Sequence, residues 1–346
     1  NPCRKQGFSR WFTIGTGGCR YFHGDTFENG HFTNENQYIT DVITDKALQY
    51  LEELGQGDAP FYLSVHYTAP HSPWEAQEHK PEYLKLYENC RFSSVPEEPL
   101  HPWQINTCPI GDTPDKRREN LTGYFAAITA MDAGVGRILD YLDNTGLSKD
   151  TVVIFTSDNG MNMGHHGVWG KGNGTYPPNM YDSSVKVPFL LSAPFLEHRG
   201  IVTERIAVQC DIFPTLLELA GCCYRPADQQ PGRSLVPFLK GEEGEEEDIF
   251  ICDEYGFVRM LRTRKEKLVL RYPQGPDAFY DLETDPEERD NRIGDKRYEE
   301  RIGEMRGRLE EWFAAYSRDP YCGKELPVTG RGQRKRCWEQ DAFLPL

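Results

Sequence analysis

The chain has 346 residues, of which 39 are basic and 54 are acidic, so its formal net charge is −15. This length suits one large α/β domain with a smaller appendage. The acidic excess argues against binding of nucleic acid or anionic membranes over the whole surface, and no run of about eighteen apolar residues predicts a membrane-spanning helix. A small anionic substrate stays compatible, because a few local cations can dominate inside a cleft.

The ten cysteines include no Cys-x-x-Cys pair, so neither a zinc ribbon nor a thioredoxin-like motif is indicated. Their even number permits disulfides, but a chain of this length does not need them, and we interpret the cysteines as free core residues. The first residue is Asn1 rather than Met, so we expect the natural start to lie upstream. Compartment and oligomeric state are not specified by the sequence.

Two segments lead up to the first strand-like run. We interpret residues 1–32, which are rich in glycine and aromatic residues, as irregular surface structure. Over residues 34–54, apolar residues recur at three- and four-residue spacing, which predicts a helix ended by the glycines that follow. Phe61–Tyr67 then predicts a buried strand, with His66 inside it as a packed or hydrogen-bonded core residue.

The turn after this strand carries a histidine between two prolines. Pro70 and Pro73 favour extended geometry and place His71 just beyond the predicted strand. Taken alone, a single histidine favours a structural role over a catalytic one. Residues 75–118, rich in prolines and charges, predict a long surface excursion that serves substrate selection near the mouth of a cleft.

The strongest helical pattern begins at Asn120 and stops at residues 144–146. Its apolar positions form one continuous stripe, which we expect in the core: Leu121, Tyr124, Phe125, Ile128, Met131, Val135, Ile138, Leu139 and Leu142.

A second set of polar residues follows the run Thr151–Thr156. This run has β-branched and aromatic residues without polar alternation, as a strand buried on both faces requires. Asp158 and Asn159 come after its end, where ligands collect in open α/β sheets. Their carboxylate and amide oxygens suit a hard cation such as Ca²⁺ or Mg²⁺, which must take its other donors from elsewhere. The same Ser-Asp-Asn-Gly sequence is also typical of a simple turn.

Helices and apolar strands continue to alternate. Val187–Ser192 is another apolar run, and residues 211–221 predict a helix with Asp211 as N-cap and Gly221 as its stop. This alternation predicts a fold of the α/β class, with a mostly parallel central sheet covered by helices.

An acidic linker at residues 241–248 marks the predicted boundary between domains 1–240 and 241–346. Beyond it, four short runs predict an antiparallel meander, and a final helix is predicted over residues 297–316. The runs are Ile249–Cys252, Phe257–Arg262, Lys267–Tyr272 and Phe279–Leu282. We interpret the basic tail 331–337 as solvated, not as a nucleic-acid site.

Several of these segments together resemble the sulfatase family of the alkaline-phosphatase-like superfamily. The matching elements are Pro70-His71-Ser72-Pro73, Ser157-Asp158-Asn159-Gly160, Gly164-His165-His166-Gly167, the helix at residues 211–221 and Tyr280–Glu288. The resemblance covers most of residues 11–320. It implies an alkaline-phosphatase-like catalytic domain, of which residues 1–240 are the C-terminal portion, and a smaller C-terminal subdomain with an antiparallel sheet plus a helix.

The resemblance also implies roles for individual residues. Asp158 and Asn159 match two ligands of a divalent cation, for which we predict Ca²⁺, with Mg²⁺ as the alternative. Lys171 falls where the family places a lysine on the sulfate and the nucleophile, and His71 matches a histidine that contacts the ester and can donate a proton. The predicted site residues are therefore His71, Lys171 and His166 for catalysis, His71, Lys171 and Trp169 for substrate binding, and Asp158 and Asn159 for metal binding.

One part of the family's active centre is not matched. The nucleophile of sulfatases is a formylglycine made from Cys or Ser within Cys/Ser-x-Pro-x-Arg, and this sequence contains no such context. The two consecutive upstream aspartates of the family are also unmatched. We therefore expect a fragment that lacks the N-terminal part of the catalytic domain, with the formylglycine upstream and with the isolated chain inactive.

These observations predict hydrolysis of a sulfate monoester of a small molecule or saccharide, with choline sulfate, aryl sulfates and sulfated sugars all open. A phosphodiesterase, phosphatase or phosphonate-ester hydrolase on the same scaffold is the alternative, because metal, His and Lys serve tetrahedral phosphorus equally well. A non-catalytic binding relative is the second alternative, and the intact set of Asp158, Asn159, His71 and Lys171 argues against it.

Overall fold

The computed structural model describes residues 7–15, 18–28, 31–193, 200–222, 230–242, 248–253 and 256–317. The chain forms two compact units. The first unit comprises Asn1–Ile154, Asn162–Gly170 and Leu191–Phe195, and the second comprises Phe155–Met161, Lys171–Leu190 and Leu196–Leu346. The acidic stretch 243–247 and the basic tail lie outside the described residues, and the predicted boundary between domains 1–240 and 241–346 stays a prediction.

The first unit opens with a three-stranded antiparallel sheet, so the prediction of irregular structure over residues 1–32 was wrong. The sheet has the order β1 (Phe12–Ile14), β2 (Gly24–Glu28) and β3 (His31–Glu35). Phe12 pairs with Glu28, and Gly24 pairs with Glu35. The sequence between β2 and β3 is Asn-Gly, the dipeptide that hairpin turns favour most strongly, and this signal could have predicted the hairpin.

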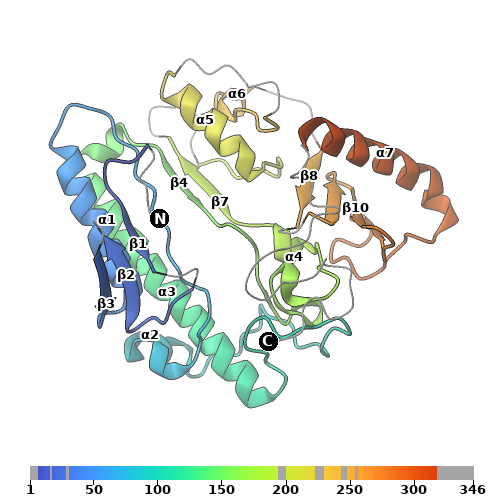
Figure 1. The fold of residues 1–346 in the computed structure, drawn as a ribbon, viewed down its shortest axis with the longest axis horizontal. Helices are drawn as coiled ribbons and strands as arrows, with labels where there is room; N and C mark the ends of the chain where they lie inside the picture. The colour runs from blue at the N-terminus through green and yellow to red at the C-terminus, as the bar shows by residue number, and fades with distance from the viewer. Residues whose placement is uncertain are drawn as a thin grey trace. The chain divides into compact units, whose positions relative to one another are not determined.

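Two long helices form the body of the first unit (Figure 1). The predicted helix over 34–54 is α1 (Ile39–Gly55), and the one predicted from Asn120 is α3 (Pro114–Thr145), which is capped by Thr113 and ends at the left-handed Gly146. The most buried positions of α3 include small residues, namely Ala126, Ala127, Ala130 and Gly134. At Gly134 an added Cβ would lie 2.5 Å from Thr44 Oγ1 on α1, so the helices approach closely there. The larger residues of the predicted stripe lie beside this contact, and Leu139 is 41% exposed.

The predicted strand Phe61–Tyr67 was wrong, because the segment forms no ladder with any other described residue. Its exposure alternates: Val65 and Tyr67 pack against the core between α1 and α3, whereas Tyr62 is 62% exposed. His66 lies on the exposed side, with Nε2 2.7 Å from Ser64 Oγ, and is not a core residue. A strand needs a hydrogen-bonded neighbour as well as a suitable sequence, and the apolar pattern reports only the latter.

Short elements connect these parts. Residues 75–118 run mostly without regular structure, as predicted, but include the 3₁₀ turn η1 (Ala76–Glu78) and α2 (Pro81–Tyr87). The 3₁₀ turn η2 (Leu147–Lys149) follows α3. The predicted apolar strands at 151–156 and 187–192 are confirmed as β4 (Val153–Thr156) and β7 (Phe189–Ser192), which form a two-stranded sheet. A small antiparallel hairpin, β5 (Asn162–Met163) and β6 (Trp169–Gly170), lies between them in sequence and encloses the 3₁₀ turn η3 (His165–Gly167).

The second unit contains the short elements η4 (Gly172–Gly174), α4 (Asp182–Val185), η5 (Gln209–Asp211), α5 (Ile212–Leu219) and α6 (Val236–Leu239). The predicted helix at 211–221 is therefore η5 followed by α5, and Gly221 ends it in the left-handed region, with φ +67°. Asp211 is not an N-cap by its side chain. Its carboxylate accepts hydrogen bonds from the backbone N–H groups of Val208 and Arg233 instead, each at 3.0 Å.

The predicted C-terminal meander is confirmed. The four strands β8 (Ile249–Cys252), β9 (Val258–Arg262), β10 (Glu266–Arg271) and β11 (Ala278–Asp281) form an antiparallel sheet in the order β11-β10-β9-β8. The 3₁₀ turn η6 (Lys296–Tyr298) leads into the predicted final helix, α7 (Glu299–Tyr316). Figure 1 shows α7 along this sheet, where Met305 and Leu309 pack against Leu261 and Leu268.

The six described cysteines, Cys19, Cys90, Cys108, Cys210, Cys222 and Cys252, are free. Cys222 and Cys252 are exposed, so the interpretation as core residues was wrong for these two. Within the described ranges, none of the helices combines the length and the apolar character that crossing a bilayer requires.

We expect Leu309→Ala to lower the free energy of unfolding of the second unit by about 2–5 kcal/mol, because the buried leucine leaves a cavity behind. Gly303→Ala on the same helix is the matched control. Nothing lies within 4 Å of a Cβ at this position, so we expect helix propensity to stabilise the helix by up to about 1 kcal/mol. Urea denaturation followed by circular dichroism measures both, and equal effects of the two variants would contradict the packing of α7.

Candidate active site

The predicted site residues are divided between the two units. His71, His166 and Trp169 belong to the first unit, and Asp158, Asn159 and Lys171 belong to the second. Their convergence in one pocket stays a prediction, and so do their individual roles. Within each unit, however, the structure defines how the loops that carry them are held.

In the first unit, the backbone around His71 is fixed by hydrogen bonds to each of four consecutive carbonyl groups. The indole N–H of Trp74 donates to Pro70 O (2.9 Å), and the hydroxyl of Tyr21 donates to His71 O (2.8 Å). His71 Nδ1 lies 2.7 Å from Ser72 O, and His79 Nε2 lies 3.1 Å from Pro73 O. Because carbonyl oxygens only accept hydrogen bonds, His71 Nδ1 and His79 Nε2 each carry a hydrogen.

This arrangement defines the protonation of two imidazoles. His71 donates through Nδ1, so its Nε2 is the acceptor of a neutral ring and the second donor of a cationic one. The His71 side chain is exposed, next to Gly18. His79 is buried, accepts a hydrogen bond from the hydroxyl of Tyr38 at Nδ1, and has its pKa lowered by burial, so it serves as a neutral support.

The His71 turn also packs closely on α3. A Cβ at Gly123 would lie 1.9 Å from Trp74 O, so only glycine allows this approach. Trp74 is itself buried and packs edge-on against Tyr124 of the same helix. The residues that support the His71 turn are therefore buried, whereas the imidazole of His71 is exposed.

The hairpin that carries His166 is held by the segment 95–104. His166 has a left-handed backbone (φ +55°), which is uncommon for a residue with a side chain. The neighbouring Gly167 has φ +68°, and a Cβ there would lie 1.9 Å from Pro99 O. Its carbonyl accepts a hydrogen bond from His101 N (2.9 Å). The predicted substrate-selecting excursion thus lies directly against the His166 turn.

Trp169 is 2% exposed and forms part of this support. The side chain of Gln104 binds both its backbone groups: Trp169 N donates to Gln104 Oε1 (2.9 Å), and Gln104 Nε2 donates to Trp169 O (2.8 Å). Its indole ring packs so closely on Gly111 that a Cβ there would lie 2.2 Å from it. This burial favours a packing role, and the substrate contact stays a prediction.

In the second unit, the loop with Asp158 and Asn159 is held from two sides. Gln209 Nε2 donates to Ser157 O (2.8 Å) and Asp158 O (3.2 Å). Gly160 N donates to Ser184 O on α4 (2.9 Å), and a Cβ on Gly160 would lie 2.2 Å from Ser183 O. The backbone of the loop is therefore immobilised against α4 and η5.

The side chains of this loop fit half of a metal site. The Asp158 carboxylate is exposed and accepts hydrogen bonds from its sequence neighbours, from Asn159 N at 2.9 Å and from Ser157 Oγ at 3.3 Å. Asn159 Nδ2 donates to Gly160 O (3.0 Å). Such oxygens suit Ca²⁺ or Mg²⁺, but the part of the chain described here holds no group of three or more His, Cys, Asp or Glu residues arranged for a metal.

The Lys171 loop connects to the same short helix. The side chain of Asn179 donates to the carbonyl groups of Lys171 (3.4 Å) and Gly172 (3.1 Å), and its oxygen accepts from Ser184 Oγ (2.6 Å). Ser184 thus holds the Asp158 loop by its carbonyl group and the Lys171 loop through Asn179. No carboxylate among the described residues forms an ion pair with Lys171.

Several of these supporting residues were missed by sequence reasoning: Tyr21, His79, Gln104, Asn179, Ser184 and Gln209. Gln104 and Trp169 are 65 positions apart, and Gln209 and Ser157 are 52 apart. No local spacing pattern could have predicted these contacts.

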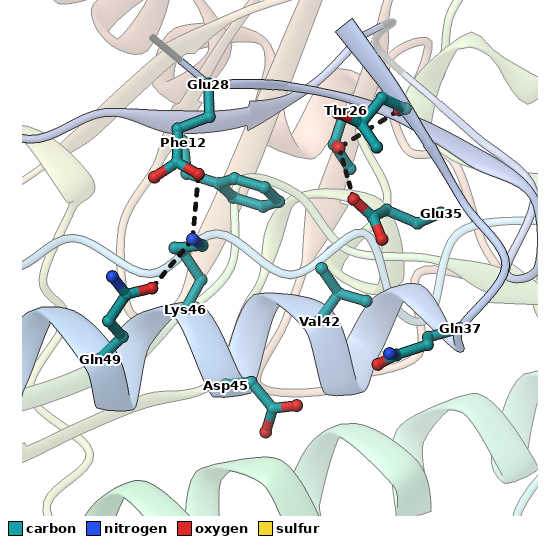
Figure 2. A pocket seen from close by; sticks show the side chains of 10 residues that line it. Phe12, Thr26, Glu28, Glu35, Gln37, Val42, Asp45, Lys46 and Gln49 are labelled. Atoms are coloured by element: carbon teal, nitrogen blue, oxygen red, sulfur yellow. Dashed lines mark hydrogen bonds and ion pairs between the residues drawn. The ribbon is translucent and has the colours of Figure 1, made fainter. Parts of the chain in front are cut away.

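A hollow of about 270 Å³ lies between the N-terminal sheet and α1. Figure 2 shows Lys46 between Glu28 and Gln49, whose oxygens accept its hydrogen bonds at 3.0 and 2.9 Å. None of the predicted site residues lines this hollow. Among its polar lining residues, Thr26 Oγ1 donates a hydrogen bond to Glu35 Oε1.

The chain belongs to the sulfatase family. The family's sequence model, Sulfatase, matches residues 1–222, and a second, described as N-sulphoglucosamine sulphohydrolase, C-terminal, matches residues 164–315. An ulvan-active sulfatase of Formosa agariphila is 28% identical over 353 residues, which cover 95% of this chain and 64% of the relative. The chain thus spans just under two thirds of the length of that curated relative.

Solved structures confirm the α/β, alkaline-phosphatase-like fold. One in complex with its substrate D-glucosamine-2-N,6-O-disulfate has a TM-score of 0.79 and 24% identity, and the match covers 94% of this chain and 79% of that one. The phosphonate monoester hydrolase of Agrobacterium radiobacter has a TM-score of 0.61 and 24% identity, covering 80% and 61%. Membership of the sulfatase family suggests a divalent metal and a formylglycine in general.

We expect Gly123→Ala to displace the His71 turn and lower the free energy of unfolding by about 1–3 kcal/mol, because the added methyl group overlaps Trp74 O. Gly136→Ala on the same helix has nothing within 4 Å and should gain up to about 1 kcal/mol. Urea denaturation and the NMR shifts of His71 measure the effects. Unchanged His71 resonances in the first variant would contradict the close support of the turn by α3.

Proposed function

We propose that this protein hydrolyses sulfate monoesters, with Asp158 and Asn159 as metal ligands, Lys171 and His71 as substrate-binding and catalytic residues, and His166 as a further catalytic residue. The observation that carries the proposal is the pair of contacts at Ser184, which holds the predicted metal loop and the predicted lysine loop on one short helix. Membership of the sulfatase family supports the same assignment.

Each residue has a distinct task in this proposal. Lys171 binds the sulfate and stabilises negative charge that develops on it, since its ammonium group has no competing carboxylate partner among the described residues. His71 holds a proton at Nε2 and gives it to the departing oxygen, while its Nδ1–H stays bonded to Ser72 O. His166 is held on a left-handed turn against segment 95–104, which we propose selects the substrate.

We propose Ca²⁺ as the cation, with Mg²⁺ as the alternative, because a carboxylate and an amide oxygen are typical Ca²⁺ ligands. When bound, the cation would polarise the sulfate oxygens. Two ligands are too few, so the proposed cation takes its remaining donors from other groups, from the substrate or from water. A sulfated saccharide is the proposed substrate class, because the relatives described above act on ulvan or bind a sulfated glucosamine.

Phosphonate-ester hydrolysis is the second candidate, and the related fold of the phosphonate monoester hydrolase favours it. Rates on matched sulfate and phosphonate esters distinguish the two. A protein that binds the metal but converts neither ester would be a non-catalytic relative.

In the catalytically complete protein, we expect Lys171→Ala to lower kcat/KM for a sulfate ester by roughly a hundredfold or more, because a preorganised charge on the reacting group is lost. Lys186→Ala, an exposed lysine of the same unit, is the control and should leave the rate within about twofold. Similar rates for the two variants would remove Lys171 from the site.

The His71→Ala variant tests the proton donor through the leaving group. We expect a loss of roughly 10²–10⁴-fold for alkyl sulfates and a much smaller loss for nitrophenyl sulfate, whose leaving group departs without protonation. Plots of log kcat/KM against leaving-group pKa measure the difference. An equal loss for all esters would assign His71 to substrate binding instead.

A further inference from the structure

The element Tyr280–Glu288, which resembles a family signature, is given no task by the proposed function. Its last residue, Glu288, is 3% exposed and has a left-handed backbone with φ +56°. Its Oε2 accepts a hydrogen bond from Asp182 N (2.6 Å), the first residue of α4. Glu288 therefore reaches from the C-terminal sheet region to the start of the helix that holds the two predicted site loops.

Glu288 belongs to a cluster of four charges, of which Lys267 and Glu288 are buried and Asp182 and Arg262 are partly buried. Lys267 is completely buried on β10, and its ammonium group binds Met180 O (3.0 Å) and Asp182 Oδ1 (2.5 Å) and forms an ion pair with Glu288. Arg262 on β9 completes the cluster, with two hydrogen bonds to the Asp182 carboxylate at 3.0 and 2.8 Å. Two cations and two anions balance, and all three ammonium donors face an oxygen.

The helix α4, which the cluster holds, contacts both predicted site loops. The helix has only four residues, so Asp182 and Ser184 move together. Ser184 O holds Gly160 N, and there is no room at Gly160 for independent adjustment, since Ser183 O would lie 2.2 Å from a Cβ. Ser184 Oγ holds Asn179, which holds the backbone of the Lys171 loop.

We propose that Glu288, together with Lys267 and Arg262, is a positioning residue for Asp158, Asn159 and Lys171. The inference rests on the proposed function for the identity of those site residues. It assigns a task to the C-terminal sheet in the reaction: the sheet carries buried charges that fix α4, and α4 fixes the metal-binding and sulfate-binding loops.

A cluster that only stabilises the sheet would behave differently from one that positions the loops. Glu288→Ala removes the acceptor of Asp182 N–H, whereas Glu288→Gln keeps an acceptor oxygen of the same reach. Leu309→Ala is the control, because it removes buried contacts from the other side of the same sheet without touching α4. Comparisons are made at the urea concentration at which each variant has the same free energy of unfolding.

The first measurement is amide hydrogen exchange at Gly160, in this chain. We expect Glu288→Ala to speed exchange by about tenfold relative to Leu309→Ala, and Glu288→Gln to restore protection to within about threefold of the unmodified chain. Equal exchange in Glu288→Ala and Leu309→Ala, or failure of Glu288→Gln to restore protection, would overturn the proposal. If Glu288→Ala does not fold, Glu288→Asp replaces it. The shorter side chain keeps the charge but moves the carboxylate oxygen away from Asp182 N, and we expect the same increase in exchange at Gly160.

The second measurement is the affinity for Ca²⁺ in the catalytically complete protein. We expect about tenfold weaker binding in Glu288→Ala, as is usual when a group that orients a ligand is lost, with recovery in Glu288→Gln and no change in Leu309→Ala. Asp158→Ala sets the scale of losing a ligand outright. Unchanged affinity in Glu288→Ala, with a large loss in Asp158→Ala, would overturn the positioning role alone. Unchanged affinity in Asp158→Ala, with faster exchange at Gly160 in Glu288→Ala, would overturn the metal assignment and leave the coupling to Glu288 standing.

Discussion

The buried ammonium group of Lys267 is the constraint on which the second unit depends. A charged amine without exposure is tolerated only where oxygens surround it, and here Met180 O, Asp182 and Glu288 do so. Burial alone would raise the pKa of Asp182, but the hydrogen bonds from Arg262 and the charge of Lys267 outweigh it and lower that pKa well below its ordinary value. Burial raises the pKa of Glu288, and the opposing charge of Lys267 does not fully offset it. Removing one of these acceptors would leave a donor of the buried ammonium group without an oxygen, so the cluster favours one arrangement of α4.

In the first unit, neutral hydrogen-bonding groups hold the turn that carries His71. Around His71, each backbone carbonyl from Pro70 to Pro73 has its own donor, and three of these donors, Trp74, Tyr21 and His79, are buried. Burial lowers the pKa of His79 and so keeps it neutral, as a support inside a core must be. His71 and Asp158 are exposed, whereas Tyr21, His79, Asn179 and Ser184, which hold the predicted site loops, are buried.

Sequence reasoning was accurate where a pattern is local. The periodicity of α1 and α3, the meander β8–β11 and the left-handed stop at Gly221 all follow from spacing or from a single residue's preference. It failed where a distant partner decides. Phe61–Tyr67 has the composition of a strand, but no described residue pairs with it, and β1–β3 form although the segment is rich in glycine. Likewise Asp158 and Lys171 could be proposed from their resemblance to a family, whereas Ser184, Asn179 and Gln104 act through partners that no spacing reveals.

The glycines around the site show why such supports are hard to replace. At Gly160 and Gly167, the carbonyl of a neighbouring segment occupies the space that a side chain would need, at 2.2 Å from Ser183 O and 1.9 Å from Pro99 O. Backbone that approaches this closely transmits position without the freedom of a side-chain rotamer. A loop held in this way keeps its side chains oriented before any ligand arrives, so binding would spend little free energy on ordering. The distribution of glycine, like the buried charges behind it, is therefore a consequence of what the exposed residues have to do.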